Sequence, residues 1–171
     1  HKKQIYDACM NRHTAAEVEL TPSSYEAAIS AIGLTIKASE QGDFAVVRPP
    51  GHHAGIERAA GFCLFNNIAI AAQKLVNEGK KVFILDIDGH HGDGTQSIFY
   101  NSDKVLYCSV HQLYAYPFSG FPIEKGKDQG EGFTLNLPLL EGSGDMEFLA
   151  VLKKAINAAI KIKPDVVGVS A

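Results

Sequence analysis

Three apolar runs, each about as long as a β-strand, constrain the fold of this chain most strongly. They are KVFILDID (81–88), VLYCSVH (105–111) and DVVGVSA (165–171). Each run is too uniformly apolar for a strand with one face in water, so we predict a buried parallel strand in each. FTLNLPL (133–139) predicts one further strand, of less certain place in the sheet.

Segments with helical periodicity alternate with these runs. Thr21-Pro22 predicts the start of a helix that carries apolar residues as far as Ile36 and ends at Gly42. We expect a second helix over about 67–78 and a third through 148–160 that ends before Pro164. FAVVR (44–48), followed by Pro49-Pro50-Gly51, predicts another buried strand that leads into a loop. This alternation indicates an α/β fold with a mostly parallel sheet.

Composition limits the class of protein. The chain has 171 residues, of which 46% are hydrophobic and 20% charged, and these values fit one globular domain spanning 1–171. A net charge of −3 and scattered lysines argue against direct binding to nucleic acid. Three widely spaced cysteines without a CxxC pair indicate a reducing, cytoplasmic setting, and no apolar run predicts a membrane span.

Two pairs of adjacent histidines are the strongest functional signal. His52-His53 lies in RPPGHHA, and His90-His91 lies in DIDGHHGDGT among three aspartates. Imidazole is the commonest metal ligand in proteins and titrates near neutral pH. Histidines concentrated beside carboxylates at predicted strand ends therefore predict a hydrolytic metal centre.

Spacing and chemistry assign roles within this centre. Asp86, Asp88 and His90 are two residues apart, so in an extended chain their side chains point to one side. We expect Asp88 and His90 to bind zinc, which accepts mixed oxygen and nitrogen ligands. His53 or His52 is the candidate general base, and Asp86 and Asp93 would orient the imidazole rings.

Other motifs fit less well. A calcium loop starting at Asp86 needs glycine at its sixth position, where His91 stands, and glutamate at its twelfth, where Ser97 stands. Gly168-Val169-Ser170-Ala171 would begin the nucleophile elbow of a serine hydrolase if glycine followed. We keep the serine hydrolase as a minor alternative, although it leaves both histidine pairs unexplained.

RPPGHHA, GFCLFNN, DIDGHHGDGT and SVHQLYAYPFSG resemble, in order and spacing, motifs of the histone deacetylase superfamily. That superfamily includes acetoin-utilisation proteins and acetylpolyamine amidohydrolases, and the resemblance covers the chain from about Thr21 onward. It implies a three-layer, arginase/deacetylase-like α/β fold with helices on both faces of the sheet. It also implies hydrolysis that removes acetyl or other acyl groups from lysine or a lysine-like amine.

The resemblance also implies roles for individual residues. Zinc would be bound by Asp88 and His90, with His53 paired to Asp93 as general base and acid and His52 paired to Asp86. A structural potassium ion would take oxygens of Asp86, Asp88, His90, Ser109 and Val110, and a second would lie near Phe99, Ser102 and Val105. The substrate channel would be lined by Gly61, Phe62 and Phe118, the last standing where relatives usually have glycine.

The resemblance leaves several points open. The third zinc ligand and an oxyanion-stabilising tyrosine are expected beyond Ala171, so we expect the sheet to be incomplete on its C-terminal side and these 171 residues alone to be inactive. Iron(II) could replace zinc. The substrate could be acetylated protein lysine or a small acetylated amine such as an acetylpolyamine. The alternative is a non-catalytic, metal-stabilised module that binds acyl-lysine.

Overall fold

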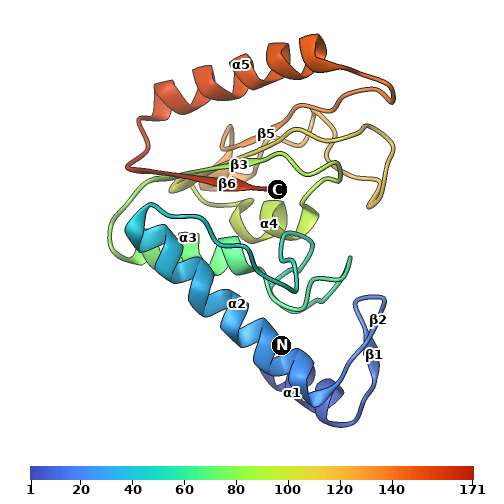
Figure 1. The fold of residues 1–171 in the computed structure, drawn as a ribbon. Coiled ribbons are helices and arrows are strands. Elements are labelled where there is room, and N and C mark those ends of the chain that lie inside the picture. The colour runs from blue at the N-terminus through green and yellow to red at the C-terminus, as the bar shows by residue number, and fades with distance from the viewer. The chain divides into compact units, whose positions relative to one another are not determined.

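The computed structural model describes residues 1–171, which form two compact units, His1–Lys74 and Leu75–Ala171 (Figure 1). Each unit has its own core, and each is described by itself. The single domain predicted from composition stays a prediction. None of the helices combines the length and apolar character that crossing a membrane requires.

The first unit is mainly helical. It contains α1 (Lys2–Met10), the hairpin strands β1 (Thr14–Ala15) and β2 (Val18–Glu19), and α2 (Pro22–Gln41), and α3 (Asn67–Asn77) begins in it. Helix α2 starts as predicted, because the Thr21 N–H donates to Ser24 Oγ at 3.0 Å and Pro22 fills the first helical position. It ends at Gly42, whose φ of 68° is a left-handed conformation that glycine adopts without strain.

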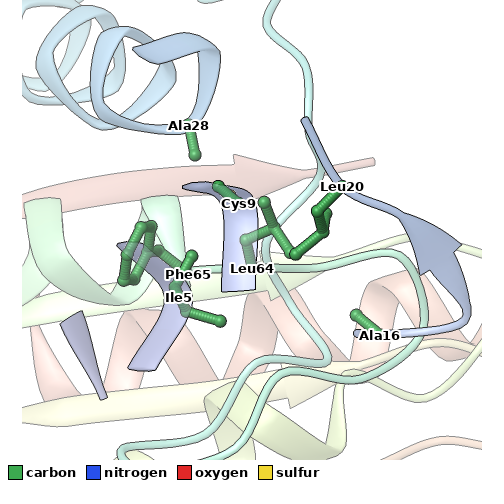
Figure 2. Packing of buried hydrophobic residues seen from close by; sticks show 7 residues of the cluster. All are labelled: Ile5, Cys9, Ala16, Leu20, Ala28, Leu64 and Phe65. Carbon is green, nitrogen blue, oxygen red and sulfur yellow. The ribbon is translucent and has the colours of Figure 1, made fainter. Parts of the chain in front are cut away.

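The core of the first unit joins the hairpin to the segment before α3. Figure 2 shows the buried side chains that make up this core, which come from α1, the hairpin region, α2 and residues 64–65. They are Ile5, Cys9, Ala16, Leu20, Ala28, Leu64 and Phe65. Because Ala16 and Leu64 share this core, the hairpin is fixed relative to the segment that carries Gly61 and Phe62.

The strand predicted over 44–48 is wrong. The structure has no strand there, and Phe44 and Val46 are 84% and 85% exposed. A strand forms when a neighbouring strand pairs with its backbone N–H and C=O groups, and no strand of the structure pairs with this segment. The apolar sequence of this segment is therefore insufficient to make it a strand.

The second unit is built on a four-stranded parallel sheet with the order β5-β4-β3-β6. The strands are β3 (Val82–Asp86), β4 (Val105–Ser109), β5 (Thr134–Asn136) and β6 (Val166–Ser170). The two central strands, β3 and β4, are almost entirely buried, as predicted. The prediction that β6 is buried is wrong, because Val167 and Val169 are 58% and 59% exposed. They are exposed because β6 is an edge strand, paired on one side only.

Helices lie on both faces of this sheet. Helix α5 (Asp145–Ile162) packs Ala155 and Ala159 against Leu106 and Cys108 of β4. Tyr107 points the opposite way, and its hydroxyl lies 3.1 Å from the Gly92 carbonyl oxygen just before α4 (Asp93–Phe99). Figure 1 shows α5 and α4 on opposite sides of the strands. A short 3₁₀ helix, η1 (Asp128–Gly130), precedes β5. The α/β fold predicted from the sequence is confirmed.

The strand register brings polar residues together at one edge of the sheet. Asp86, the last residue of β3, pairs with Ser109 of β4 on one side and with Ser170 of β6 on the other. Ser109 in turn pairs with Asn136 of β5. The carboxyl ends of parallel strands are where α/β proteins bind ligands, so this row marks the place to look for a site.

Candidate active site

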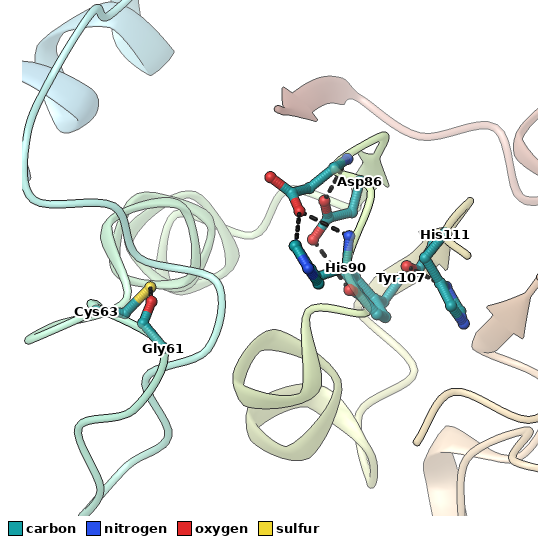
Figure 3. Close-up of polar contacts among 8 residues, drawn as sticks. Gly61, Cys63, Asp86, His90, Tyr107 and His111 are labelled. Carbon is teal, nitrogen blue, oxygen red and sulfur yellow. Dashed lines mark hydrogen bonds and ion pairs between the residues drawn. The ribbon is translucent and has the colours of Figure 1, made fainter. Parts of the chain in front are cut away.

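Asp86 is a fully buried carboxylate at the end of β3. Its Oδ2 accepts a hydrogen bond from the Tyr107 hydroxyl at 3.0 Å (Figure 3). The same hydroxyl lies 3.1 Å from the Gly92 carbonyl oxygen. Burial raises the pKa of Tyr107 well above its usual value, and the Asp86 charge raises it further. The phenol therefore remains a hydrogen-bond donor, and it connects the end of β3 to the start of α4.

Asp88 and His90 lie in a bend after β3 rather than on the strand itself. The Asp88 N–H donates to Asp86 Oδ1 at 3.2 Å, and the His90 N–H donates to Asp88 Oδ1 at 2.7 Å. These contacts fold the chain so that His90 Nδ1 and Asp88 Oδ1 are 3.3 Å apart. The alternation of an extended strand does not produce this convergence, because the strand ends at Asp86.

The two side chains fit a zinc ion. Two donors that bind zinc at about 2.0–2.1 Å with tetrahedral geometry are separated by about 3.3–3.4 Å. The observed separation of 3.3 Å between Asp88 Oδ1 and His90 Nδ1 matches that spacing, and one donor is oxygen and the other nitrogen. The chain has no group of three or more His, Cys, Asp or Glu side chains arranged to hold a metal. Binding of a metal by this pair stays a prediction.

Ser109 and Val110, two of the residues predicted to contact potassium, are buried at the end of β4. The Val110 N–H donates to the Asp86 carbonyl at 2.9 Å, and Ser109 Oγ lies 2.8 Å from His111 Nδ1. The potassium site stays a prediction.

Asp93, predicted to orient a histidine ring, is the first residue of α4.

A buried histidine pair that the sequence did not assign to the site lies beside these residues. The rings of His91 and His111 are 4.8 Å apart, and both side chains are buried. Burial lowers the pKa of His91, and burial together with the His91 charge lowers the pKa of His111 to about 4. Both rings contact the loop that carries Phe118: His91 Nδ1 lies 2.8 Å from Ser119 Oγ, and His111 Nε2 lies 3.1 Å from the Gly120 carbonyl.

Gly120 shows how closely that loop approaches the two rings. Its φ is 84°, and a Cβ placed there would lie 2.6 Å from His91 Cγ. Phe118 itself is 72% exposed. The sequence places His111 shortly before the loop that carries Phe118, but the packing of its ring against His91 is not visible from spacing.

His52 and His53 lie in a tight loop of the first unit and are 8% and 4% exposed. Their ring centroids are 4.0 Å apart. Two asparagines from GFCLFNN hold this loop: Asn66 Nδ2 donates to the Ala54 carbonyl at 2.9 Å, and Asn67 Nδ2 donates to the Pro49 carbonyl at 3.0 Å. Sequence reasoning missed the role of these asparagines, although two adjacent amides at a helix start are a recognisable signal.

The site residues divide between the two units. The histidine pair His52-His53 and the segment Gly61-Phe62 belong to the first unit, and the remaining candidates belong to the second. Those are Asp86, Asp88, His90, Asp93, Ser109, Val110 and Phe118. The pairings of His53 with Asp93 and of His52 with Asp86 stay predictions.

Known proteins resemble this chain in sequence. A probable deacetylase of Archaeoglobus fulgidus is 43% identical over 156 residues, covering 86% of this chain and 44% of that protein. An acetylpolyamine amidohydrolase of Mycoplana ramosa is 44% identical over 139 residues, covering 75% of this chain and 41% of that protein. The chain thus spans less than half the length of these two relatives.

Solved structures show the same fold. A histone deacetylase homologue from Aquifex aeolicus superposes with a TM-score of 0.89 at 32% identity, covering 98% of this chain and 50% of that chain. The HD domain of HDA15 gives a TM-score of 0.93 at 36% identity, covering all of this chain and 54% of that chain. The histone deacetylase domain model matches residues 2–171. On these grounds, and with the strand-end Asp88–His90 pair in place, the chain belongs to the histone deacetylase family.

Proposed function

We propose that the protein containing this chain hydrolyses the amide of an acetylated or otherwise acylated amine, lysine or a lysine-like amine. The observation that carries the proposal is the 3.3 Å convergence of Asp88 Oδ1 and His90 Nδ1 at the sheet edge, in a chain of the deacetylase family. Zinc, or iron(II) in its place, would be held by these two residues and by a further ligand. A metal there would polarise the acyl carbonyl and lower the pKa of the attacking water.

The histidines supply proton transfer in this proposal. His53 accepts a proton from the attacking water and returns it to the departing amine, with Asp93 orienting its ring. His52, with Asp86, is the electrostatic partner of His53. These roles follow the family resemblance, and the nearly complete burial of both rings supports them, since a buried imidazole keeps a fixed orientation.

The proposal extends to the surroundings of the site. A potassium ion at Asp86, Ser109 and Val110 would have a structural role, and Gly61, Phe62 and Phe118 would line the channel that takes the substrate stem. Relatives named as acetylpolyamine amidohydrolase and as deacetylase support acetylated amines as the substrate class. Both an acetylated diamine and an acetyl-lysine peptide carry the required amide on an alkyl stem.

Acetate release from these two substrates tests the proposal in the full-length protein. We expect Asp88→Ala to lower kcat/KM by about a hundredfold or more, because it removes a candidate metal ligand. A chelator should lower kcat/KM of the wild type by a similar factor. Added zinc should then restore the activity of the wild type but not that of Asp88→Ala. Asp103→Ala is the matched control, since Asp103 is a surface carboxylate ion-paired with Lys104.

Three results would contradict the proposal. They are wild-type turnover in Asp88→Ala, turnover that resists metal removal, and a wild type that binds acetyl-lysine without releasing acetate. The last result would instead favour a non-catalytic binding module.

A further inference from the structure

We propose that Glu17 is a positioning residue whose carboxylate holds the Gly61–Phe62 turn against the imidazole of His53. All of these residues belong to the first unit. The inference rests on the proposed function for the roles of His53 and Phe62, while the contact between Glu17 and the turn stands on its own.

Two tight turns meet in this part of the first unit. The β1–β2 hairpin turns at Ala16 and Glu17, with φ values of 52° and 62°. The second turn is Gly61-Phe62, with φ values of 53° and 65°, and the antiparallel bridge between Ala60 and Cys63 closes it. Positive φ at both central residues is typical of type I′ turns. Three of the four residues are not glycine and seldom adopt this conformation, so contacts around the turns must maintain it.

Hydrogen bonds connect the two turns. The Gly61 N–H donates to Glu17 Oε2 at 2.8 Å, and the Phe62 N–H donates to the Ala16 carbonyl at 3.0 Å. On the other side, the Cys63 thiol lies 3.3 Å from the Gly61 carbonyl (Figure 3). Both N–H groups of the Gly61–Phe62 turn are therefore satisfied by the hairpin.

His53 lies directly under this turn. A Cβ at Gly61 would overlap the imidazole of His53, so the ring packs against the bare α-carbon of the glycine. His53 is 4% exposed. A shift of the turn would therefore change the packing of the ring to which the proposed mechanism assigns proton transfer.

The other end of the turn faces solvent. The Phe62 side chain is 57% exposed and lines a cavity of about 690 Å³, together with Val18, Leu20 and Leu64. In this turn, Gly61 packs against the imidazole of His53, and Phe62 presents an aromatic ring that a substrate could contact.

Of the two hydrogen bonds from the hairpin to the Gly61–Phe62 turn, only the one to Glu17 uses a side chain. The contact from Ala16 uses a backbone carbonyl, which any residue provides. The contact from Glu17 uses a carboxylate, and a hydrogen bond to a charged acceptor is stronger than one between neutral groups. Glutamine at this position would keep an acceptor oxygen without the charge.

Amide hydrogen exchange at Gly61 in the full-length, metal-loaded protein tests the contact directly. We expect Glu17→Ala to speed exchange at Gly61 by about tenfold, because the N–H loses its acceptor. Glu17→Gln should stay close to wild type. Glu19→Ala is the matched control, since it removes a carboxylate from the same hairpin without removing the acceptor of Gly61, and it should leave the exchange unchanged.

Two further measurements connect the contact to the site. The ring resonances of His53 should shift in Glu17→Ala but not in Glu19→Ala. The KM for an acetylated amine should rise several-fold in Glu17→Ala and return in Glu17→Gln, with kcat changed less than KM.

Unchanged Gly61 exchange in Glu17→Ala would overturn the proposal. So would a Glu17→Gln variant in which Gly61 exchanges as fast as in Glu17→Ala, because a side chain of the same length that still offers an acceptor oxygen would then fail to hold the turn. Exchange needs no turnover, so these results decide the role of Glu17 even if the wild type hydrolyses no acetylated amine. A wild type that hydrolyses no acetylated amine would contradict the proposed function but not the role of Glu17.

Discussion

Asp86 shows how a buried charge is accommodated next to the candidate metal ligands. Its carboxylate is fully buried, and a buried carboxylate destabilises a fold unless hydrogen bonds compensate it. The Tyr107 hydroxyl donates to one oxygen, and the Asp88 N–H donates to the other. The bond from Asp88 also starts the bend that brings Asp88 and His90 together.

Tyr107→Phe tests how far the hydrogen bond from the phenol compensates the buried carboxylate of Asp86. The substitution removes a hydrogen bond to the buried Asp86 Oδ2, so we expect a loss of about 1–3 kcal/mol in the free energy of unfolding. Urea denaturation measures this loss. Tyr114→Phe, at a residue that is 72% exposed, should change the stability by much less. Equal stability of Tyr107→Phe and wild type would show that Asp86 does not depend on the phenol.

An exposed carboxylate caps the start of helix α5. Glu147 Oε2 accepts the Gly144 N–H at 3.0 Å, and this bond lowers the pKa of Glu147 below its usual value. In the unfolded chain the pKa returns to about 4.5. The unfolded state therefore binds more protons in acid, and the stabilisation is fully present above pH 4.5 and is lost as the pH falls through the lower, folded-state pKa.

Glu147→Gln should accordingly lower stability at pH 7 and have a smaller effect at pH 3. Urea unfolding at the two pH values checks this, with Glu141→Gln as a control on a nearby exposed glutamate. An effect of Glu147→Gln that is the same at both pH values would contradict the assigned cap.

Elements with strong local signals could be predicted from the sequence. The periodicity of α2, α3 and α5 and the apolar runs of β3 and β4 agree with the structure. The β1–β2 hairpin was not predicted, because strands of two residues show no pattern. The segment 44–48 has the composition of a strand but no neighbour, and the exposure of β6 depends on which strands lie beside it. The pairing of distant segments decides whether 44–48 forms a strand and how exposed β6 is. A single sequence does not reveal that pairing.

The candidate site shows the same division. The motifs identified Asp88 and His90, yet the geometry that joins them is a bend held by Asp86, not an extended strand. The support of His52 and His53 by Asn66 and Asn67 also required the fold. Residue types and their spacing are visible in the sequence, and the hydrogen bonds that orient those residues are not.

The two compact units of the molecule carry different candidate site residues. The second carries the Asp88–His90 pair at the end of a parallel sheet, and the first carries the buried His52-His53 pair. The proposed function assigns both pairs to one reaction. The central claim is that Asp88 and His90 bind one divalent cation.

Anomalous diffraction at the zinc edge, from crystals of the full-length protein loaded with zinc, tests this claim most directly. The account predicts one strong peak about 2.0–2.2 Å from both Asp88 Oδ1 and His90 Nδ1. A zinc-loaded protein whose anomalous peak lies away from these two atoms would contradict it.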